Sequence, residues 1–553
     1  MGKLNISLKN ILDRHISPLK HQNVVLNSEQ DVVGLIRDTG MINIDGCEIN
    51  FKLNIKSILQ YFADEGIILR DIRIVNSVLN KGISFFDVQI DGNLYFWENT
   101  CWKCDFSNLK VNGFSYFSNT IFKSISIFDH AVFLKDCFFW GVEFFDKCSL
   151  RNCEFQGRLD FWNAAFYNAV DFSHSTFKSD FDFSNTECSG IVLFKDTAFG
   201  NKENSSMSVF DNMQCRESVV FADSNFRSEV SICKSNCNKV LDITRCSINN
   251  TMAITDTVFG NLKMNYTHIY SPVYIKGAEN VECIDLQNAW IDTILNIYFI
   301  GHSKIQNLSF NKTIFSKNSI VSIEGIDVED SCEINFCNII GALSIYNSKI
   351  NLVEANCSSV IGSLILKDTK INLIDLTNST STGRIITDSN NCLNPLNRET
   401  ANILRHQKEK EGDVILSLRY KEIEMRRYKA DFDKLSILEK IRNIDEIIIV
   451  KLNYWSNDYG QSWLRGVAFT LLVSFIFTVL LSIMNKEIGL TNFYYQFFQQ
   501  DFWNRVIEFL WFPSVDEFKS KDLLYVIISL LGKIMVAYGI FQTVMSFRKY
   551  SKS

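Results

Sequence analysis

The chain has 553 residues, a formal net charge of −6 at pH 7 and 46% hydrophobic residues. This charge gives no reason to expect nucleic acid as a partner, and the length allows several domains. Two counts are unusual, because the chain contains 45 Phe and only 4 Pro. Frequent Phe indicates one structural position that is filled repeatedly. Scarce Pro suits hydrogen-bonded ladders, in which a missing N–H is costly.

Residues 1–80 mix helical and strand-like stretches, and we expect them to form an N-terminal cap of mixed α/β structure. A cap is needed because an array of repeats otherwise ends in an unpaired edge. The first thirty residues lack the apolar core of a secretory signal peptide. We therefore expect this end of the chain to stay in the cytoplasm.

Residues 81–390 carry an apolar repeat with a period of eleven. Phe106, Phe117 and Phe128 belong to one series, and Phe122 and Phe133 belong to a second series offset by five. A helix would place apolar residues three and four apart and a strand two apart, so neither explains the spacing. One inward side chain per short strand and turn does explain it, with four such sides in a turn of about 20–22 residues. The sequence thus predicts a β-solenoid of about 14 turns with a filled interior.

The predicted core ladder consists of phenylalanines that recur at this spacing. They are Phe117, Phe122, Phe128, Phe133, Phe144, Phe155, Phe161, Phe166, Phe172, Phe177, Phe183 and Phe194. Gly341, Gly362 and Gly383 recur at one further full turn each, which indicates that the solenoid continues to about residue 390.

Segments such as VDFSHSTFKSDFDFSNTECSG resemble the pentapeptide-repeat family in its Phe-rich form with an 11-residue unit. The resemblance implies a mainly β fold, a right-handed quadrilateral β-helix. It also implies that the residue two positions before each core residue is small and points inward.

Residues 391–465 are charged and poor in Gly, and they predict a linker of one or two amphipathic helices. Residues 466–553 predict a transmembrane module, because apolar runs at about 466–484 and 523–545 are each long enough to cross a bilayer. Basic residues lie before the first run and after the second. This distribution predicts that both termini and the solenoid are cytoplasmic.

The stretches KLNYWSNDYGQSWLRGVAFT and GIFQTVMSFRKY resemble the C-terminal module of bacterial membrane-bound pentapeptide-repeat proteins. The resemblance implies a multi-pass protein of the bacterial inner membrane. Some relatives carry a two-helix ion-channel unit, but the segment between the runs here has no Thr-Val-Gly-Tyr-Gly-like filter. Lys533 is the candidate intramembrane functional residue, since a charge at this depth is costly. It could line a pore, pair with Glu508, lie at a helix–helix contact, or snorkel to the interface.

No residues are predicted to be catalytic, cofactor-binding or metal-binding. Cys101 and Cys104 have the spacing of half a zinc site, but Cys104 falls in the small inward position and no second pair matches it. The 16 Cys are better explained as small buried apolar residues in a reducing compartment. No nucleophile motif or phosphate loop is present, so we do not expect an enzyme.

Three functions remain open. The first is a membrane-anchored scaffold or sensor, whose partners are the lipid bilayer and an unidentified protein. The second is a channel-like effector gated by the cytoplasmic solenoid, which requires a homo-oligomer because two helices cannot enclose a pore. The third is a DNA mimic that inhibits topoisomerase, suggested by the excess of carboxylates in the solenoid. The membrane tether argues against the third, and no nucleic acid is expected to bind.

Overall fold

The structure is a computed structural model that describes residues 24–39, 42–64, 70–201, 205–387, 393–485, 497–511 and 522–551. The expectations for residues 1–23, for the solenoid end near 390 and for parts of the loop between the apolar runs fall outside these residues. The chain divides into two compact units. One is Met1–Ile371 with Thr382–Ile386, and the other is Asn372–Ser381 with Thr387–Ser553.

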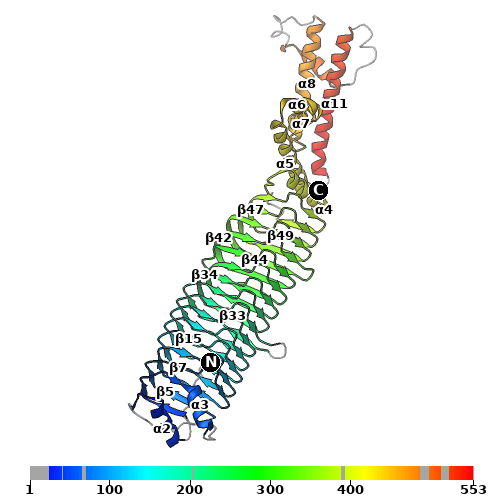
Figure 1. Cartoon of the computed structure of the whole chain (residues 1–553). Coiled ribbons are helices and arrows are strands. Elements are labelled where there is room, and N and C mark those ends of the chain that lie inside the picture. Colours follow the sequence, from blue (N-terminus) through cyan, green and yellow to red (C-terminus); the bar gives the residue numbers. More distant parts are fainter. Residues whose placement is uncertain are drawn as a thin grey trace. The chain divides into compact units, whose positions relative to one another are not determined.

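The first unit is a parallel β-solenoid of about 16 turns, which confirms the predicted fold class. A typical turn contains β10 (Thr100–Cys101), β11 (Cys104–Asp105), β12 (Lys110–Val111) and β13 (Ser115–Tyr116). Each strand of this turn pairs in parallel with the strand four later in the chain, as β13 does with β17 (Cys137–Phe138). Figure 1 shows these stacked turns running from blue to green. Because one turn contains two 11-residue units, equivalent residues in this region mostly lie 22 positions apart.

Phenylalanine rings fill the interior and stack on rings one turn away. The centroids of Phe117 and Phe139 are 4.6 Å apart with an interplanar angle of 4°. Those of Phe122 and Phe144 are 4.8 Å apart, also at 4°. The small residues two positions before the core residues are buried as well. They are Ser115, Ser126, Cys137, Cys148, Ala164, Ser175, Thr186 and Thr197.

Alternate corners require a left-handed backbone. Asn163, two residues after Phe161, has φ of 60°, and His174, two residues after Phe172, has φ of 62°. Asn and Asp tolerate this region better than other non-glycine residues, since a short polar side chain can bond locally. This requirement explains why Asn and Asp recur at this position along the repeat.

Parallel pairing begins earlier than the repeat pattern indicates. β1 (Val24–Leu26) already pairs with β3 (Cys47–Ile49), and β2 (Ile42–Asp45) pairs with β5 (Ile72–Val75). Two helices, α2 (Glu29–Thr39) and α3 (Ile55–Asp64), interrupt these first turns. The N-terminal region therefore contains both helices and strands, and its strands extend the solenoid beyond the 14 turns predicted.

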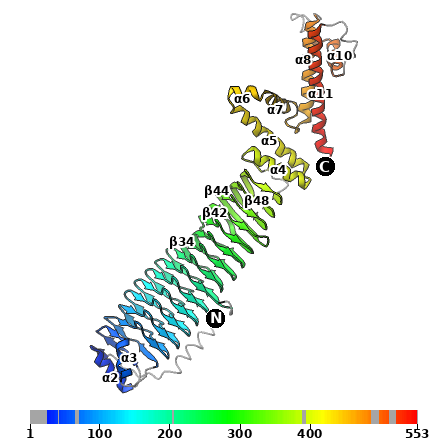
Figure 2. The same ribbon diagram turned by 45° about the vertical axis from the view of Figure 1, so that its right-hand side comes forward.

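The second unit is mainly helical and is seen from another side in Figure 2. Asn397 caps α4 (Arg398–Glu411), which ends at Gly412 with φ of 79°. Asp413 then caps α5 (Val414–Asp433), and a capping box of Ser436 and Glu439 begins α6 (Ile437–Arg442). α7 (Ile444–Asn457) completes the linker. The sequence thus forms four helices where one or two were expected, because these caps divide the charged segment.

Three further helices follow the linker. They are α8 (Trp463–Met484), α10 (Gln500–Glu508) and α11 (Leu523–Ser551). The apolar helices predicted at 466–484 and 523–545 are thus present, and each is somewhat longer than the apolar run that indicated it.

Candidate functional site

α8 and α11 are each long and apolar enough to cross a membrane. They pack closely and antiparallel through small residues. A Cβ on Gly466 would lie 2.5 Å from Thr543 Oγ1, and one on Gly539 would lie 2.4 Å from Thr470 Oγ1. Small residues let helix backbones approach, which is how helices associate in a bilayer.

Lys533 lies on α11 and contacts the segment that follows α10. Its Nζ donates a hydrogen bond to the carbonyl of Trp511 and lies 4.7 Å from the ring centroid of Phe509. A backbone carbonyl and an aromatic face are both favourable partners for an ammonium group. These contacts give Lys533 a role in holding the chain between the two long helices.

α10 packs against the middle of α8 rather than beyond its end. Ser474 Oγ, about halfway along α8, donates a hydrogen bond of 2.5 Å to the carbonyl of Val506. The buried face of α10 carries Phe502 and Val506. Another face of α10 exposes polar residues, namely Asp501, Asn504 and Glu508. If α8 crosses a bilayer, α10 lies at membrane depth with a polar face uncovered.

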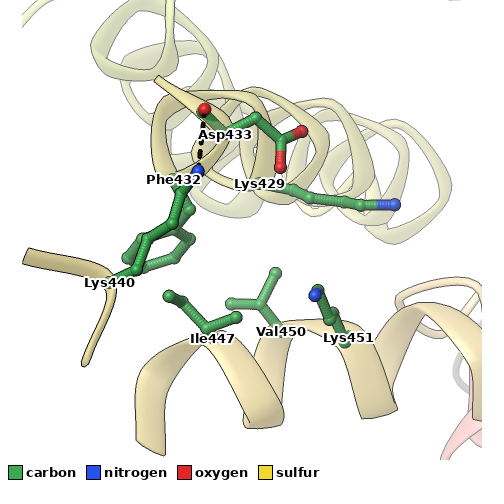
Figure 3. Close-up of a pocket in the computed structure, with 7 residues that line it drawn as sticks. All are labelled: Lys429, Phe432, Asp433, Lys440, Ile447, Val450 and Lys451. Carbon is green, nitrogen blue, oxygen red and sulfur yellow. Dashed lines mark hydrogen bonds between the residues drawn. The ribbon is translucent and has the colours of Figure 1, made fainter. Parts of the chain in front are cut away.

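A small cavity of about 130 Å³ lies between α5, α6 and α7 (Figure 3). Its lining combines apolar and basic side chains: Lys429, Phe432, Asp433, Lys440, Ile447, Val450 and Lys451. Lys440 Nζ donates to the carbonyl of Asp433 at 3.1 Å.

Aromatic side chains form a column on the outward side of the solenoid wall, in which Tyr95 and Tyr116 are half-buried and Phe138 is buried. Tyr95 of β9 (Leu94–Tyr95), Tyr116 of β13 and Phe138 of β17 occupy equivalent positions in successive turns. The ring centroids of Tyr95 and Tyr116 are 5.4 Å apart at 4°, and those of Tyr116 and Phe138 are 5.3 Å apart at 20°. Because the turns are in regular register, the residues at this position in successive turns stack into a column.

Three more aromatic residues flank this column. Trp97 lies 5.6 Å from Tyr95, Phe114 lies 6.5 Å from Tyr116, and Trp140 lies 4.9 Å from Phe138, measured between ring centroids. We call the six residues the aromatic stripe: Tyr95, Trp97, Phe114, Tyr116, Phe138 and Trp140.

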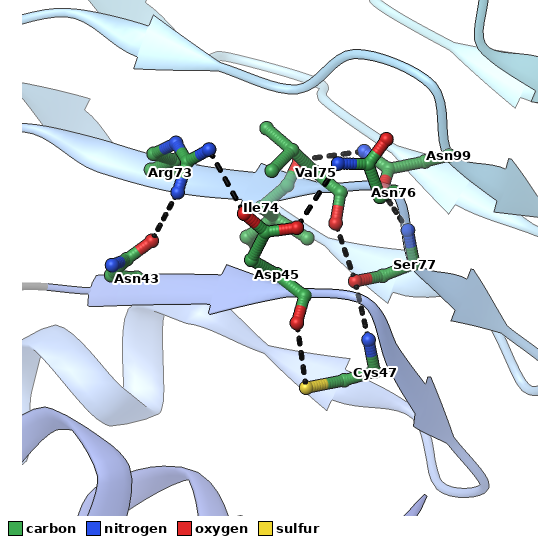
Figure 4. A network of polar contacts seen from close by, with 9 residues as sticks. All are labelled: Asn43, Asp45, Cys47, Arg73, Ile74, Val75, Asn76, Ser77 and Asn99. Atoms are coloured by element: carbon green, nitrogen blue, oxygen red, sulfur yellow. Dashed lines mark hydrogen bonds and ion pairs between the residues drawn. The ribbon is translucent and has the colours of Figure 1, made fainter. Parts of the chain in front are cut away.

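An arginine network lies beside one end of the stripe, and Figure 4 shows the residues of this network. Arg73 pairs with Tyr95 in the ladder register, and its guanidinium lies 5.9 Å from the Trp97 ring centroid. Arg73 donates to Asp45 Oδ2 at 3.0 Å and to Asn43 Oδ1 at 2.8 Å. Only about a tenth of the Arg73 and Asp45 side chains is exposed, so this pair is rigidly held.

A second arginine network closes the other end. Asp160 follows Phe138 in the ladder, and Asp182 follows Asp160. Arg158 donates to Asp160 at 2.7 Å and to Asp182 at 3.1 Å. Burial raises the pKa of the Asp160 carboxyl, and the nearby Arg158 charge opposes that rise. The stripe thus runs between two Arg–Asp groups.

The structure buries all twelve phenylalanines of the predicted ladder, together with Cys101 and Cys104. Among the described residues, no group of three or more His, Cys, Asp and Glu side chains could hold a metal ion. Sequence reasoning missed the stripe, although Tyr95, Tyr116 and Phe138 recur at nearly the full-turn period and directly precede core phenylalanines. Comparisons of the chain with family models, with curated proteins and with solved structures found no match.

Proposed function

We propose that this protein is a membrane-anchored, non-enzymatic scaffold whose solenoid docks a protein partner through the aromatic stripe. The stripe itself is the observation that carries the proposal. Tyr and Trp contribute much of the binding energy of protein interfaces, and both residue types are gathered here on one wall of the solenoid. Phe114 is 41% exposed, Tyr95, Trp97, Tyr116 and Trp140 are half-buried, and Phe138 is buried beneath the surface. The stripe therefore offers a partly exposed aromatic surface outside the phenylalanine core.

The anchoring half of the proposal depends on α8 and α11. Many of their large apolar side chains face outward, including Leu472, Ile476 and Leu530, each at least half exposed. Lipid is the solvent in which such a surface is stable. The basic residues at both outer ends favour cytoplasmic termini, and the resemblance to bacterial membrane-bound relatives favours the inner membrane.

The test uses the full-length protein in membranes, with a photo-crosslinking amino acid at Tyr116 or, as a matched control, at Tyr167. Tyr167 is 46% exposed on the solenoid, more than the half-buried Tyr116, and it packs against Phe145, outside the stripe. We expect a discrete protein adduct from position 116, lost when Trp97 and Trp140 are replaced by Ala, and none from position 167. Equal labelling at both positions would refute a role for the stripe. Release of the protein from membranes by alkaline carbonate would refute the anchoring.

The arrangement of α10 favours a second function, an oligomeric channel-like effector. A polar face at the depth of the middle of a spanning helix requires water or another copy of the chain. Lys533 supports this function less than its sequence position indicates, because it contacts Trp511 and Phe509 within its own chain.

Ion flux across proteoliposomes tests the second function, with Asp501→Asn/Glu508→Gln as the variant and Lys533→Leu as the comparison. A channel lined by α10 predicts flux whose cation preference falls in the first variant. If the protein is a monomer and conducts no ions, the channel function is refuted and the scaffold is the function that stays proposed.

A further inference from the structure

α6 and α7 expose a large apolar surface for two helices beside a candidate membrane span. Seven of their side chains are at least half exposed: Ile437, Leu438, Ile441, Ile444, Ile448, Ile449 and Trp455. Leu438 is 81% exposed and Ile437 is 78% exposed. Soluble surfaces rarely gather apolar residues in this way, so the patch indicates something that covers it.

Hydrogen bonds join α7 to α11, the helix that pairs with α8. Asn453 Oδ1 accepts from Tyr538 Oη at 2.7 Å and from Gln542 Nε2 at 3.1 Å. Both partners lie in the C-terminal half of the candidate span Leu523–Phe547. At the C-terminal end of this span, the Trp463 ring stacks on Phe547 with centroids 5.0 Å apart. Trp is enriched where a bilayer meets water, so this end is the expected interface.

The cavity between α5, α6 and α7 adds positive charge beside the apolar surface. Lys429, Lys440 and Lys451 line it, with Asp433 as the single carboxylate. In Figure 3, Lys429 of α5 and Lys451 of α7 approach the same side of the cavity from opposing helices. Within the described part of the chain, none of the three lysines forms an ion pair with a carboxylate. Lys429 instead lies 4.2 Å from the Tyr454 ring centroid, and Lys440 binds a backbone carbonyl.

We propose that α6 and α7 lie in the membrane–water interface and that the cavity binds the phosphate headgroup of an anionic lipid. This inference rests on the proposed membrane anchoring. An amphipathic helix with apolar residues on one face and basic residues beside them lies in the plane of the interface. The apolar side chains enter the acyl region, and the lysines meet the phosphate at the level of the headgroups. A leaflet rich in anionic lipid thereby holds the linker against the membrane.

The first experiment places the full-length protein in nanodiscs of phosphatidylcholine, with and without phosphatidylglycerol, and measures hydrogen exchange of residues 436–449. We expect slower exchange with phosphatidylglycerol, and Lys429→Gln/Lys451→Gln should remove the difference. A basic side chain near an anionic surface contributes about 1 kcal/mol, which is a factor of about five in the binding constant. The loss of two lysines should therefore weaken the affinity of the linker for the phosphatidylglycerol surface about 25-fold. The control, Lys410→Gln/Lys421→Gln, removes two exposed lysines on α4 and α5 that do not line the cavity.

The second variant, Leu438→Ser/Ile441→Ser, tests insertion. It should lose protection in both types of nanodisc, whereas Leu396→Ser/Ile415→Ser, which changes exposed residues outside the patch, should not. Equal exchange in the two lipids would overturn the headgroup site. Equal protection by inorganic phosphate without lipid would make it a phosphate site. A dimer that dissociates in the Leu438→Ser/Ile441→Ser variant would make the patch an interface between copies. Failure of the protein to float with vesicles of either composition would overturn the anchoring as well.

Discussion

Phe144 and Phe145 are adjacent in the chain, yet they lie on opposite sides of the solenoid wall. Phe144 is 1% exposed and stacks between Phe122 at 4.8 Å and Phe166 at 5.1 Å. Phe145 is 40% exposed, lies 4.7 Å from Tyr167 and has the Lys123 ammonium 3.8 Å from its ring centroid. Replacing each by Ala therefore removes the same atoms from two very different environments.

Truncation of a buried Phe costs about 3–5 kcal/mol, and two lost ring stacks place Phe144→Ala toward the upper end. Phe145→Ala loses one exposed cation–π contact and one exposed ring contact, which amounts to about 1 kcal/mol. A long solenoid need not unfold in one step, so the assay is local hydrogen exchange. Exchange of the turns around Phe144 should accelerate roughly 10²- to 10⁴-fold in Phe144→Ala, because 1.4 kcal/mol corresponds to tenfold. Similar acceleration in the two variants would refute the assignment of inside and outside.

Three further predictions concern the backbone and the thiols. Gly362→Ala should destabilise its turn by about 1–3 kcal/mol in local exchange, since the new Cβ would lie 1.9 Å from Gly341 O and 2.3 Å from Ile340 O. Gly34→Ala, whose Cβ meets nothing within 4 Å in helix α2, should instead stabilise by up to about 1 kcal/mol. Phe336 has φ of 58° and is 60% exposed, so Phe336→Asn should raise the free energy of local opening at its corner by about 1 kcal/mol and slow hydrogen exchange there. Asn163→Phe should lower this free energy and accelerate exchange at its own corner. Burial raises the pKa of Cys153, Cys246 and Cys337 from 9.0 to about 12. Between these values the unfolded chain binds fewer protons than the folded chain, so stability should fall as pH rises above 9 and not below it. Replacing the three Cys by Ala should make the decrease of the denaturation midpoint above pH 9 less steep, and an unchanged slope would contradict the burial.

The interior of the solenoid could be predicted from sequence because one residue type repeats there at a constant interval. The two apolar helices were equally visible, since length and the absence of charge are properties of the chain alone. The first turns were harder to recognise. Their inward residues are Leu and Ile rather than Phe, as at Leu26, Ile44 and Ile74, and helices α2 and α3 break the period.

The division of the linker was present in the sequence but was not used. The pair Gly412–Asp413 ends one helix and caps the next, and Ser436 with Glu439 forms a capping box. The position of α10 had no comparable signal. Its depth beside α8 depends on contacts such as Ser474 with Val506, which no periodicity encodes.

The column that contains Tyr95 and Tyr116 shows how the outward residues of this fold can vary while its core is kept. Most short strands present one residue to the core and its neighbour to the outward side, although the outward residues Phe138 and Asp160 are themselves buried. The residue type of the outward column can therefore change while the inner column is kept. Along one column the outer residues are Tyr95, Tyr116 and Phe138 and then Asp160 and Asp182, while the inner residues remain Phe96, Phe117, Phe139, Phe161 and Phe183. The core therefore sets the spacing of the outer side chains and leaves their chemistry free. A partner that recognises the stripe would read aromatic residues at intervals of about 5 Å between two fixed Arg–Asp groups. Moving the stripe by one turn, with the core unchanged, should move the binding site by the same distance.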